Sequence, residues 1–170
     1  MENKKKTLLI TGAGGFVGKN LVAQLRNEGW NDLLLFDVDT PKELLADYAA
    51  RADFVFHLAG VNRPQNPEEF YEGNRGFTEH LLALLAAAGN KAPVLVTSSI
   101  QAELDNDYGK SKREAEELIF AHERATGAPA TCGTRHTASL WYTSTTWWPA
   151  SSPRWRGVPR GTVPFPATAI

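Results

Sequence analysis

A glycine-rich turn near the N-terminus constrains the fold of this 170-residue chain more than any other feature. The turn reads TGAGGFVG over residues 11–18 and joins two segments of different periodicity. The segment before it, residues 7–11, is a short apolar run of the kind that forms a strand buried on both faces. The segment after it, residues 16–28, has the apolar spacing of an amphipathic helix that ends at Gly29. The pattern therefore predicts a strand, a tight turn and a helix at the start of the chain.

The spacing of three glycines in this turn suits a bound dinucleotide. Gly12 permits the tight turn, Gly15 lets the backbone approach a pyrophosphate, and Gly18 lets the helix pack closely on the strand. The phosphates then lie at the positive N-terminus of the helix. A glycine-rich turn that only reverses the chain is the alternative, and the strand–turn–helix context argues against it. We therefore expect NAD(H) or NADP(H) to bind at this turn.

Apolar runs alternate with helical patterns as far as residue 130. Further strands are expected over residues 32–36, 53–58 and 93–98, and helices over residues 40–51, 66–89 and 108–126. Thr40, which precedes Pro41, is expected to cap the first of these helices. Such an alternation is typical of a parallel sheet with helices on both faces. The sequence therefore predicts an α/β fold, a Rossmann-like doubly wound parallel sheet, with residues 1–130 as its nucleotide-binding domain.

Residues 131–170 have a different composition from the rest of the chain. They hold no Asp, Glu or Lys, but four of the five tryptophans and half of the prolines. They show no period of 2 or 3.6, although the fold needs another strand where they begin. Two explanations stay open: an irregular extension, or translation from a shifted reading frame. Either way, we expect a truncated sheet followed by an irregular tail that is not a domain.

Composition excludes several classes of partner. The net charge of −1 gives no reason to expect nucleic acid or an anionic membrane as a partner. No apolar run approaches the roughly 20 residues of a membrane span. The single cysteine fits a reducing compartment, and no metal-ligand spacing is present. We therefore expect a cytoplasmic protein without a metal site, and a homodimer stays open.

An acidic residue follows the second predicted strand, where dinucleotide sites place the carboxylate that meets a ribose. The sequence there reads FDVD, with Asp37 directly after the strand. A carboxylate at this position accepts hydrogen bonds from ribose hydroxyls and repels a 2′-phosphate, which favours NAD over NADP. The alternative is that Asp37 and Asp39 are solvated loop residues.

A tyrosine and a lysine four residues apart form the second informative pattern. Tyr108 and Lys112 share one face of the last predicted helix. An ammonium beside a phenol stabilises the phenolate, which makes the tyrosine a usable acid or base. Ser99, after the fourth strand, can hydrogen-bond the same reacting oxygen. A surface helix is the alternative for the Tyr/Lys spacing alone.

Other polar residues carry weaker signals. His57 lies in a predicted strand and is expected to be a packed core residue, whereas His80 and His122 fall on helices and are expected to be exposed. Asn62 and Arg63 follow the third strand at its carboxyl end, where open sheets bind ligands. We expect them to contact substrate or pyrophosphate, with an ordinary loop as the alternative.

These motifs together resemble the extended short-chain dehydrogenase/reductase family, which includes NAD-dependent sugar-nucleotide epimerases and dehydratases. The segments FHLAGVNRP (56–64), SSIQA (98–102) and DNDYGKSK (105–112) resemble the reductase half of bifunctional capsular polysaccharide enzymes acting on UDP-acetamido-sugars. The resemblance covers residues 7–129. It implies an enzyme that transfers hydride at a carbon of a UDP-sugar, in surface polysaccharide biosynthesis.

The resemblance also implies roles for individual residues. The implied catalytic residues are Ser99, Tyr108 and Lys112, of which the last two also contact the cofactor. The other implied cofactor contacts are Gly12, Gly15, Phe16 and Val17 at the turn, and Leu58, Ala59 and Gly60 near the nicotinamide. Gly18 and Asp37 are expected at the cofactor from the spacing described above.

The chain departs from the wider family in three ways. One strand–helix unit is absent between the second and third strands, and Ser99 and Tyr108 are only nine residues apart; the capsular subgroup shares both features. Residues 130–134 do not match the buried strand that follows the Tyr/Lys helix in the family. The cofactor half is thus recognisable and the substrate half is not. An active enzyme, a dinucleotide-binding module without turnover and an inactive truncated product all stay open.

Overall fold

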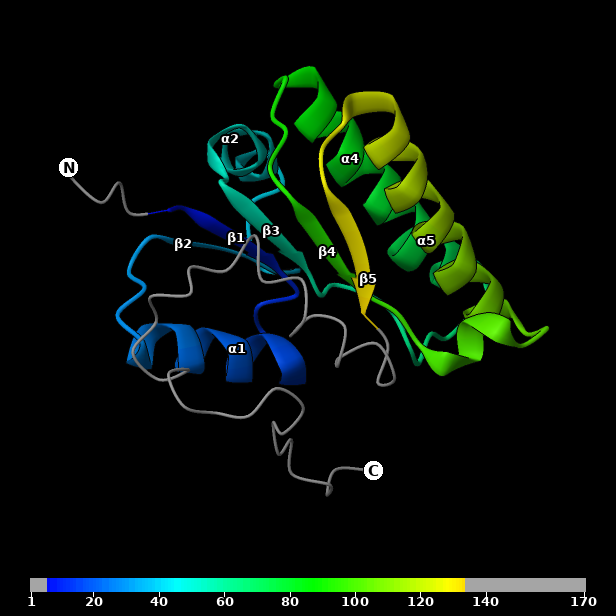
Figure 1. The fold of residues 1–170 in the computed structure, drawn as a ribbon. Helices are drawn as coiled ribbons and strands as arrows, with labels where there is room; N and C mark the ends of the chain where they lie inside the picture. Colours follow the sequence, from blue (N-terminus) through cyan, green and yellow to red (C-terminus); the bar gives the residue numbers. More distant parts are fainter. Residues whose placement is uncertain (1–5, 134–170) are drawn as a thin grey trace, which may run out of the picture.

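A five-stranded parallel sheet forms the centre of the computed structural model, which describes residues 6–133 (Figure 1). The strands are β1 (Leu8–Thr11), β2 (Leu33–Phe36), β3 (Phe54–His57), β4 (Val94–Thr97) and β5 (Ala130–Gly133). Their order in the sheet is β2-β1-β3-β4-β5, and every neighbouring pair is parallel. The predicted Rossmann-like α/β fold is confirmed.

Helices cover both faces of this sheet. They are α1 (Phe16–Asn27), α2 (Leu44–Arg51), α3 (Glu68–Phe70), α4 (Phe77–Ala87) and α5 (Asp107–Thr126), with a 3-10 turn, η2, at Ile100–Glu103. Figure 1 shows α1 on one face and α2, α4 and α5 on the other. This is the doubly wound arrangement that alternating strands and helices predict.

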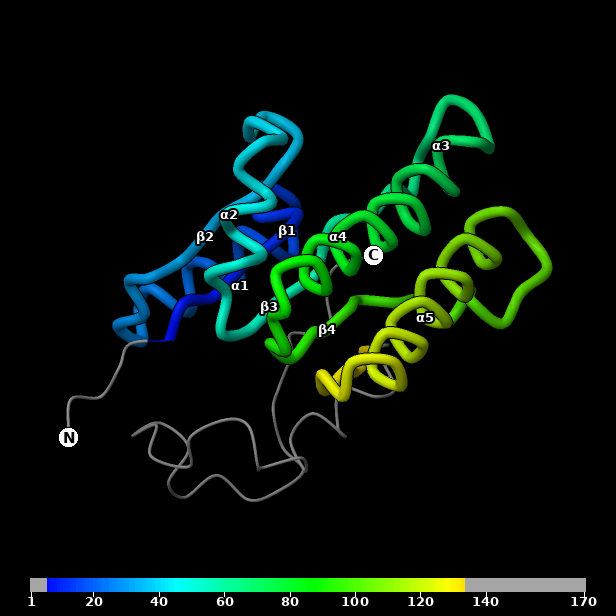
Figure 2. The backbone as a smooth tube through the Cα atoms, turned by 90° about the horizontal axis from the view of Figure 1, so that it is seen from above, coloured from blue at the N-terminus to red at the C-terminus, as the bar shows by residue number. Residues whose placement is uncertain are grey.

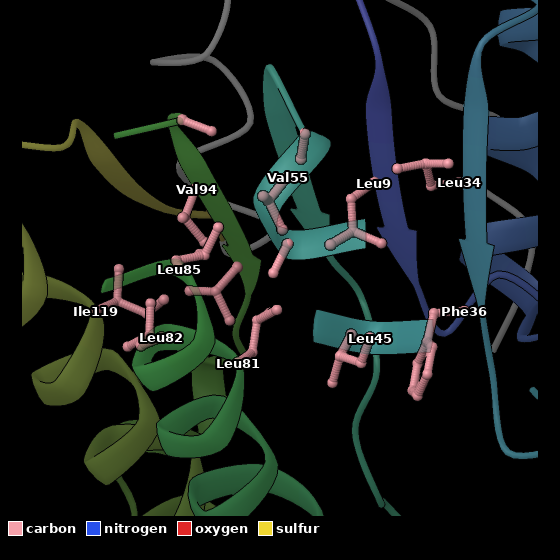
Figure 3. Packing of buried hydrophobic residues seen from close by; sticks show 14 residues of the cluster. Leu9, Leu34, Phe36, Leu45, Val55, Leu81, Leu82, Leu85, Val94 and Ile119 are labelled. Carbon is pink, nitrogen blue, oxygen red and sulfur yellow. The ribbon is translucent and has the colours of Figure 1, made fainter. Parts of the chain in front are cut away.

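The core divides into two layers because successive strand residues point to opposite faces. Leu8 and Ile10 of β1 pack with Val22 and Leu25 of α1. Leu9, between them, points the other way into the larger layer that α2, α4 and α5 cover. Figure 3 shows that layer, in which strand residues meet helix residues such as Leu45, Leu81, Leu85 and Ile119. All four residues of β1 are buried, as its continuous apolar run predicts.

The strand order makes the carboxyl ends of β1 and β3 a topological switch point, which is called the β1–β3 crevice below. From β1 the chain passes to β2 on one side, and then crosses to β3 on the other side of β1. Neighbouring connections therefore leave the carboxyl ends of β1 and β3 in opposite directions, and open α/β sheets bind ligands at such a point. The glycine-rich turn follows β1, and residues 58–60 follow β3, so both segments lie at this crevice.

A π-helical segment interrupts the helix predicted over residues 66–89. The segment, η1, spans Tyr71–Gly76 and joins α3 directly to α4. Figure 2 shows the helical path continuing from α3 into α4. π-Helical turns are rare and occur frequently at functional sites. The predicted helix is therefore present, but its first half has a wider winding that the apolar pattern does not reveal.

The predicted cap at Thr40 is wrong. Helix α2 begins at Leu44, and Pro41 only accepts a turn hydrogen bond from the Leu44 amide at 3.1 Å. The Thr40 hydroxyl instead accepts a hydrogen bond from the Asp37 backbone amide at 2.9 Å. The hydroxyl is thus used to close the turn after β2, and it does not cap the helix.

The fifth strand crosses the predicted boundary between body and tail. β5 pairs with β4 in parallel register, with Val94 opposite Ala130 and Val96 opposite Cys132. The sheet therefore extends to Gly133, where the sequence pattern alone predicts no strand. The predicted irregular tail from residue 134 onward lies outside the described residues, so the division into domains stays a prediction.

Two glycines with opposite backbone requirements test this fold. Gly127 ends α5 in the left-handed region, with φ of 70°, so Gly127→Ala should lower the free energy of unfolding by about 1–2 kcal/mol. Gly76 has helical φ of −62°, and a β-carbon there would lie 3.5 Å from the Tyr71 carbonyl oxygen. Gly76→Ala should therefore raise the free energy of unfolding by about 0.5–1 kcal/mol. Urea denaturation measures the change in the free energy of unfolding for each variant. Changes of the same sign in the two variants would contradict the assigned conformations.

Candidate active site

The glycine-rich turn fits against the loop that follows β3. Gly12 has φ of 69°, and a β-carbon there would lie 2.6 Å from the backbone nitrogen of Ala59. A β-carbon on Gly18 would overlap the backbone oxygen of Gly12. Neither position has room for a side chain, because the turn, helix α1 and the β3 loop meet there.

The N-terminus of α1 is open to a ligand. Gly15 is the residue that precedes the helix, and its amide donates to the Gly12 carbonyl at 3.1 Å. Gly14 and Gly15 are exposed, and the next two side chains, Phe16 and Val17, are 75% and 55% exposed. A phosphate can therefore approach the positive end of the helix without displacing buried side chains.

Asp37 holds the glycine-rich turn in place. Its Oδ2 accepts a hydrogen bond from the Gly14 amide at 2.6 Å, and its Oδ1 accepts one from the Val38 amide at 2.8 Å. Asp39 is exposed. The carboxylate of Asp37 thus lies at the turn, as a ribose-binding residue must. It also has a structural role that neither sequence interpretation included.

The loop after β3 continues the crevice. Leu58 and Ala59 donate backbone hydrogen bonds to the Thr11 carbonyl and hydroxyl oxygens, at 3.1 and 3.4 Å. A β-carbon on Gly60 would lie 2.7 Å from Lys112 Nζ. The missing side chain of Gly60 therefore leaves the space into which the lysine ammonium reaches.

Ser99 and Tyr108 line one cleft of about 510 Å³. The Asn106 side chain caps α5 by accepting from the Gly109 amide at 2.7 Å, which places Tyr108 in the first turn of the helix. The Tyr108 ring packs against Phe70, with 5.5 Å between the ring centres. The complete lining is Asn62, Phe70, Ser99, Gln101, Asn106, Asp107 and Tyr108.

Lys112 lies one helical turn beyond Tyr108 and is only 8% exposed. Its ammonium donates a long hydrogen bond of 3.4 Å to the Thr97 carbonyl at the end of β4. Burial lowers the pKa of Lys112, and the nearby Cys132 and Glu116 act in the opposite direction. A partly desolvated cation at this place is suited to stabilise a phenolate or to donate to hydroxyl groups.

The two predicted substrate residues differ in position. Asn62 lines the cleft beside Ser99 and Tyr108. Arg63 is exposed and is not among the residues that line the cleft. Of this pair, the structure therefore brings only Asn62 next to the candidate catalytic groups.

The histidines also differ from one another. His57 is 1% exposed and lies within hydrogen-bond distance of two threonine hydroxyls, which confirms a packed core residue. His80 is exposed, as predicted. The prediction for His122 is wrong, because it is only 8% exposed. It faces the interior from α5. The charged residues near it in the sequence make this part of the helix look exposed.

Asn74 is a site residue that the sequence analysis missed. It lies in the π-helical segment, is 2% exposed, and its side chain bonds both the amide and the carbonyl of Val61, at 2.9 and 3.0 Å. Its Nδ2 also lies 3.0 Å from Ser111 Oγ, beside Lys112. The available signal was the sequence GNRG within a predicted helix, because glycine and asparagine are poor helix formers.

Metal and membrane features are absent from the described part of the chain. Within residues 6–133, no group of three His, Cys, Asp or Glu side chains is arranged to hold a metal ion. No helix within that range is both long and apolar enough to cross a membrane.

The burial of Lys112 predicts that its charge lowers the stability of the fold. Lys112→Met keeps the volume and removes the charge, so it should raise the free energy of unfolding at pH 7 by about 1 kcal/mol. Because the folded-state pKa of Lys112 is lowered, the unfolded chain binds more protons up to the ordinary pKa of 10.5. The free energy of unfolding of the unsubstituted protein therefore increases as the pH rises. The amount by which Lys112→Met exceeds it in free energy of unfolding should become smaller between pH 7 and pH 10. Urea denaturation at both pH values tests this, and a less stable variant at pH 7 would contradict it.

Comparison with known proteins identifies two reductases as relatives of this chain. It is 46% identical over 122 residues to a UDP-2-acetamido-2,6-beta-L-arabino-hexul-4-ose reductase of Pseudomonas aeruginosa, covering 72% of this chain and 33% of that protein. It is 30% identical over 134 residues to a ceramide reductase of Caulobacter vibrioides, covering 66% of this chain and 41% of that protein. The chain therefore spans about a third to two fifths of the length of these relatives.

Solved structures agree with the sequence relatives. The capsular polysaccharide assembling protein CapF of Staphylococcus aureus matches with 41% identity and a TM-score of 0.60, over 74% of this chain and 34% of that one. RMD of Pseudomonas aeruginosa, complexed with NADPH, matches with 28% identity and a TM-score of 0.61, over 75% of this chain and 52% of that one. The model of the NAD dependent epimerase/dehydratase family matches residues 8–137. The chain belongs to the NAD-dependent epimerase/dehydratase family.

Proposed function

We propose that this chain carries the cofactor-binding and proton-donating part of an NAD(P)-dependent sugar-nucleotide oxidoreductase. The observation that carries the proposal is one of placement. The glycine-rich turn lies at the β1–β3 crevice, and the cleft lined by Ser99 and Tyr108 opens at the same ends of the strands, with Lys112 behind Gly60. Family membership supports a nicotinamide cofactor.

The residues present fit such a cofactor. Gly12 and Gly18 leave no room for a β-carbon, which is the close packing that a pyrophosphate-binding turn requires. The pyrophosphate would bind at residues 12–18, the adenosine ribose at Asp37, and the nicotinamide end near residues 58–60. When bound, the nicotinamide supplies or accepts the hydride.

Three side chains of this chain handle the proton and the substrate oxygen. During reduction of a keto group, the Tyr108 hydroxyl gives its proton to the carbonyl oxygen and is left as a phenolate. The Lys112 ammonium stabilises that phenolate and donates to the cofactor ribose. The Ser99 hydroxyl donates to the same carbonyl oxygen and orients it. Asn62, in the same cleft, contacts the sugar.

Relatives suggest the substrate class. One is named for a UDP-acetamido-hexulose and another for capsular polysaccharide assembly. We therefore propose a UDP-sugar as substrate and surface polysaccharide biosynthesis as the biological role. A cytoplasmic location is part of the proposal, because it suits the cofactor and the single cysteine.

A binding module with little turnover is the second candidate for the 170-residue chain by itself. The relatives are about three times as long as the region they share with it. Positioning of a sugar carbon within about 3–3.5 Å of a hydride donor requires a grip on the whole substrate. The chain's own cleft offers the seven lining residues between Asn62 and Tyr108 for that purpose.

Nucleotide binding is the first expected outcome. NADH should bind more tightly than NADPH, because the Asp37 carboxylate repels a 2′-phosphate. Asp37→Asn keeps an oxygen that can accept from the Gly14 amide but removes the charge, so it should reduce the difference between the NADH and NADPH affinities. Asp37→Ala should reduce that difference too, and it should also loosen the turn because the hydrogen bond to Gly14 is lost. Titration of all three proteins with each nucleotide, followed by nucleotide fluorescence, measures the six affinities. Equal affinities in the parent would contradict the proposed preference, and no saturation by either nucleotide would contradict the binding site.

Catalysis is the second expected outcome. The 170-residue chain should show little or no consumption of NAD(P)H with a UDP-acetamido-4-keto-hexose, because its own residues hold little of the substrate. A full-length homologue with the same SSIQA and DYGKSK segments should be active. Replacement by phenylalanine of its tyrosine equivalent to Tyr108 should lower kcat by a factor on the order of 10² or more. Robust turnover by the 170-residue chain that Tyr108→Phe abolishes would contradict the second candidate and support the assigned proton donor.

A further inference from the structure

Four buried polar side chains form a line beneath the crevice. They come from β1, β3, η1 and α4, and each is at most 2% exposed: Thr11, His57, Asn74 and Thr78. The proposed chemistry uses none of them directly. Since buried polar groups cost free energy unless they are paired, a line of four in one core requires an explanation.

The hydrogen bonds of this line run in one direction only. The Thr78 hydroxyl donates to the Asn74 carbonyl at 2.6 Å, so its single proton is used. His57 Nε2, at 2.8 Å from Thr78 Oγ1, must therefore carry the proton and donate it. His57 Nδ1 is then bare and accepts from the Thr11 hydroxyl at 2.7 Å. Thr11 Oγ1 in turn accepts from the Ala59 amide at 3.4 Å.

The imidazole in this line is neutral. A charged imidazole carries a hydrogen on Nδ1 as well as on Nε2. That hydrogen would face the proton that the Thr11 hydroxyl donates to Nδ1. Burial and the neighbouring Lys112 cation lower the pKa of His57 to about 3. Protonation would thus both reverse a hydrogen bond and place a second positive charge beside Lys112.

Both ends of the line reach the proposed nucleotide site. At one end, the Ala59 backbone packs against Gly12 of the glycine-rich turn. At the other end, the line holds the Asn74 carbonyl, while the Asn74 side chain binds Val61 and Ser111, the latter adjacent to Lys112 in sequence. The line therefore joins the strand that carries the turn to the helix that carries the lysine.

We propose that His57 and Thr78 are positioning residues for the nucleotide site, acting through a one-directional hydrogen-bond chain from Ala59 to Asn74 in which the His57 proton is on Nε2. This role rests on the proposed nucleotide binding, and neither residue contacts the nucleotide. The chain sets the separation between the glycine-rich turn, the loop after β3 and the π-helical segment. A core histidine that only fills space would need no particular tautomer.

A matched pair of threonine variants tests the positioning role. Thr78→Val keeps the shape and removes the hydroxyl, whereas Thr78→Ser keeps the hydroxyl. Thr78→Val should weaken NADH binding by about ten-fold, because it breaks the chain between His57 and Asn74, and Thr78→Ser should stay within about two-fold of the parent. The free energy of unfolding is measured alongside, and affinity is referred to folded protein. Equal NADH affinities of folded Thr78→Val and parent would overturn the positioning role.

Imidazole ¹⁵N NMR on the unaltered protein tests the chain without any variant. We expect His57 to carry its proton on Nε2, with a bare Nδ1, and to remain unchanged between pH 7 and pH 4.5. The ring of His80, which is exposed, supplies a reference signal from the same sample. A proton on Nδ1, or titration of His57 near pH 6.5, would overturn the proposed chain even if Thr78→Val fails to fold.

The two experiments separate this proposal from the proposed function. Failure of the parent to bind either nucleotide, with the Nε2 proton observed, would overturn the proposed function and the positioning role that rests on it. Binding by the parent together with the wrong tautomer would overturn this proposal alone. Binding, the expected tautomer and a selective loss in Thr78→Val would support both.

Discussion

The close approach of two backbones at the β1–β3 crevice is the constraint on which the rest of the site depends. Gly12 meets the Ala59 backbone so closely that no β-carbon fits, and Gly18 brings helix α1 against the same turn. Parallel pairing of β1 with β3 fixes this geometry, because it brings the residues after Thr11 and after His57 to one edge of the sheet. A nucleotide at that edge would meet backbone amides and a helix N-terminus, which do not need to rearrange.

A buried cation lies among neutral groups beside that crevice. Lys112 is buried with one long hydrogen bond to a carbonyl, and burial lowers its pKa, so an apolar residue of equal size would pack there at lower cost. The adjacent His57 stays neutral because both ring nitrogens are paired and Lys112 is close. One cation is tolerated in this region because the buried His57 beside it is uncharged, and the half-buried Glu116 acts to keep Lys112 protonated.

Sequence reasoning predicted the parts of this molecule that depend on period and on glycine spacing. The short apolar runs, the turn and the Tyr108/Lys112 helix lie where the pattern placed them, because strands buried on both faces give continuous apolar runs and amphipathic helices give a 3.6-residue period. The π-helical segment and the second role of Asp37 leave no trace in the apolar pattern. Asn74 had one signal, the two glycines around it in a predicted helix, but its contacts with Val61 and Ser111 follow no sequence period. The predictions of a helix cap at Thr40 and of an exposed His122 were wrong for the same reason. Tertiary contacts determine which hydroxyl caps a helix and which helix face is buried.

Within residues 6–133, the contacts that form the crevice lie between residues 11 and 112. β5 itself adds to the sheet through backbone pairing with β4, which places few demands on side chains; Thr131 in its middle is exposed. The reacting groups depend on the same core, because Asn106 caps the helix that presents Tyr108 and Asn74 holds the loop beside Lys112. The glycine-rich turn and the side chains that line the cleft therefore rest on one set of buried contacts between the sheet and its helices.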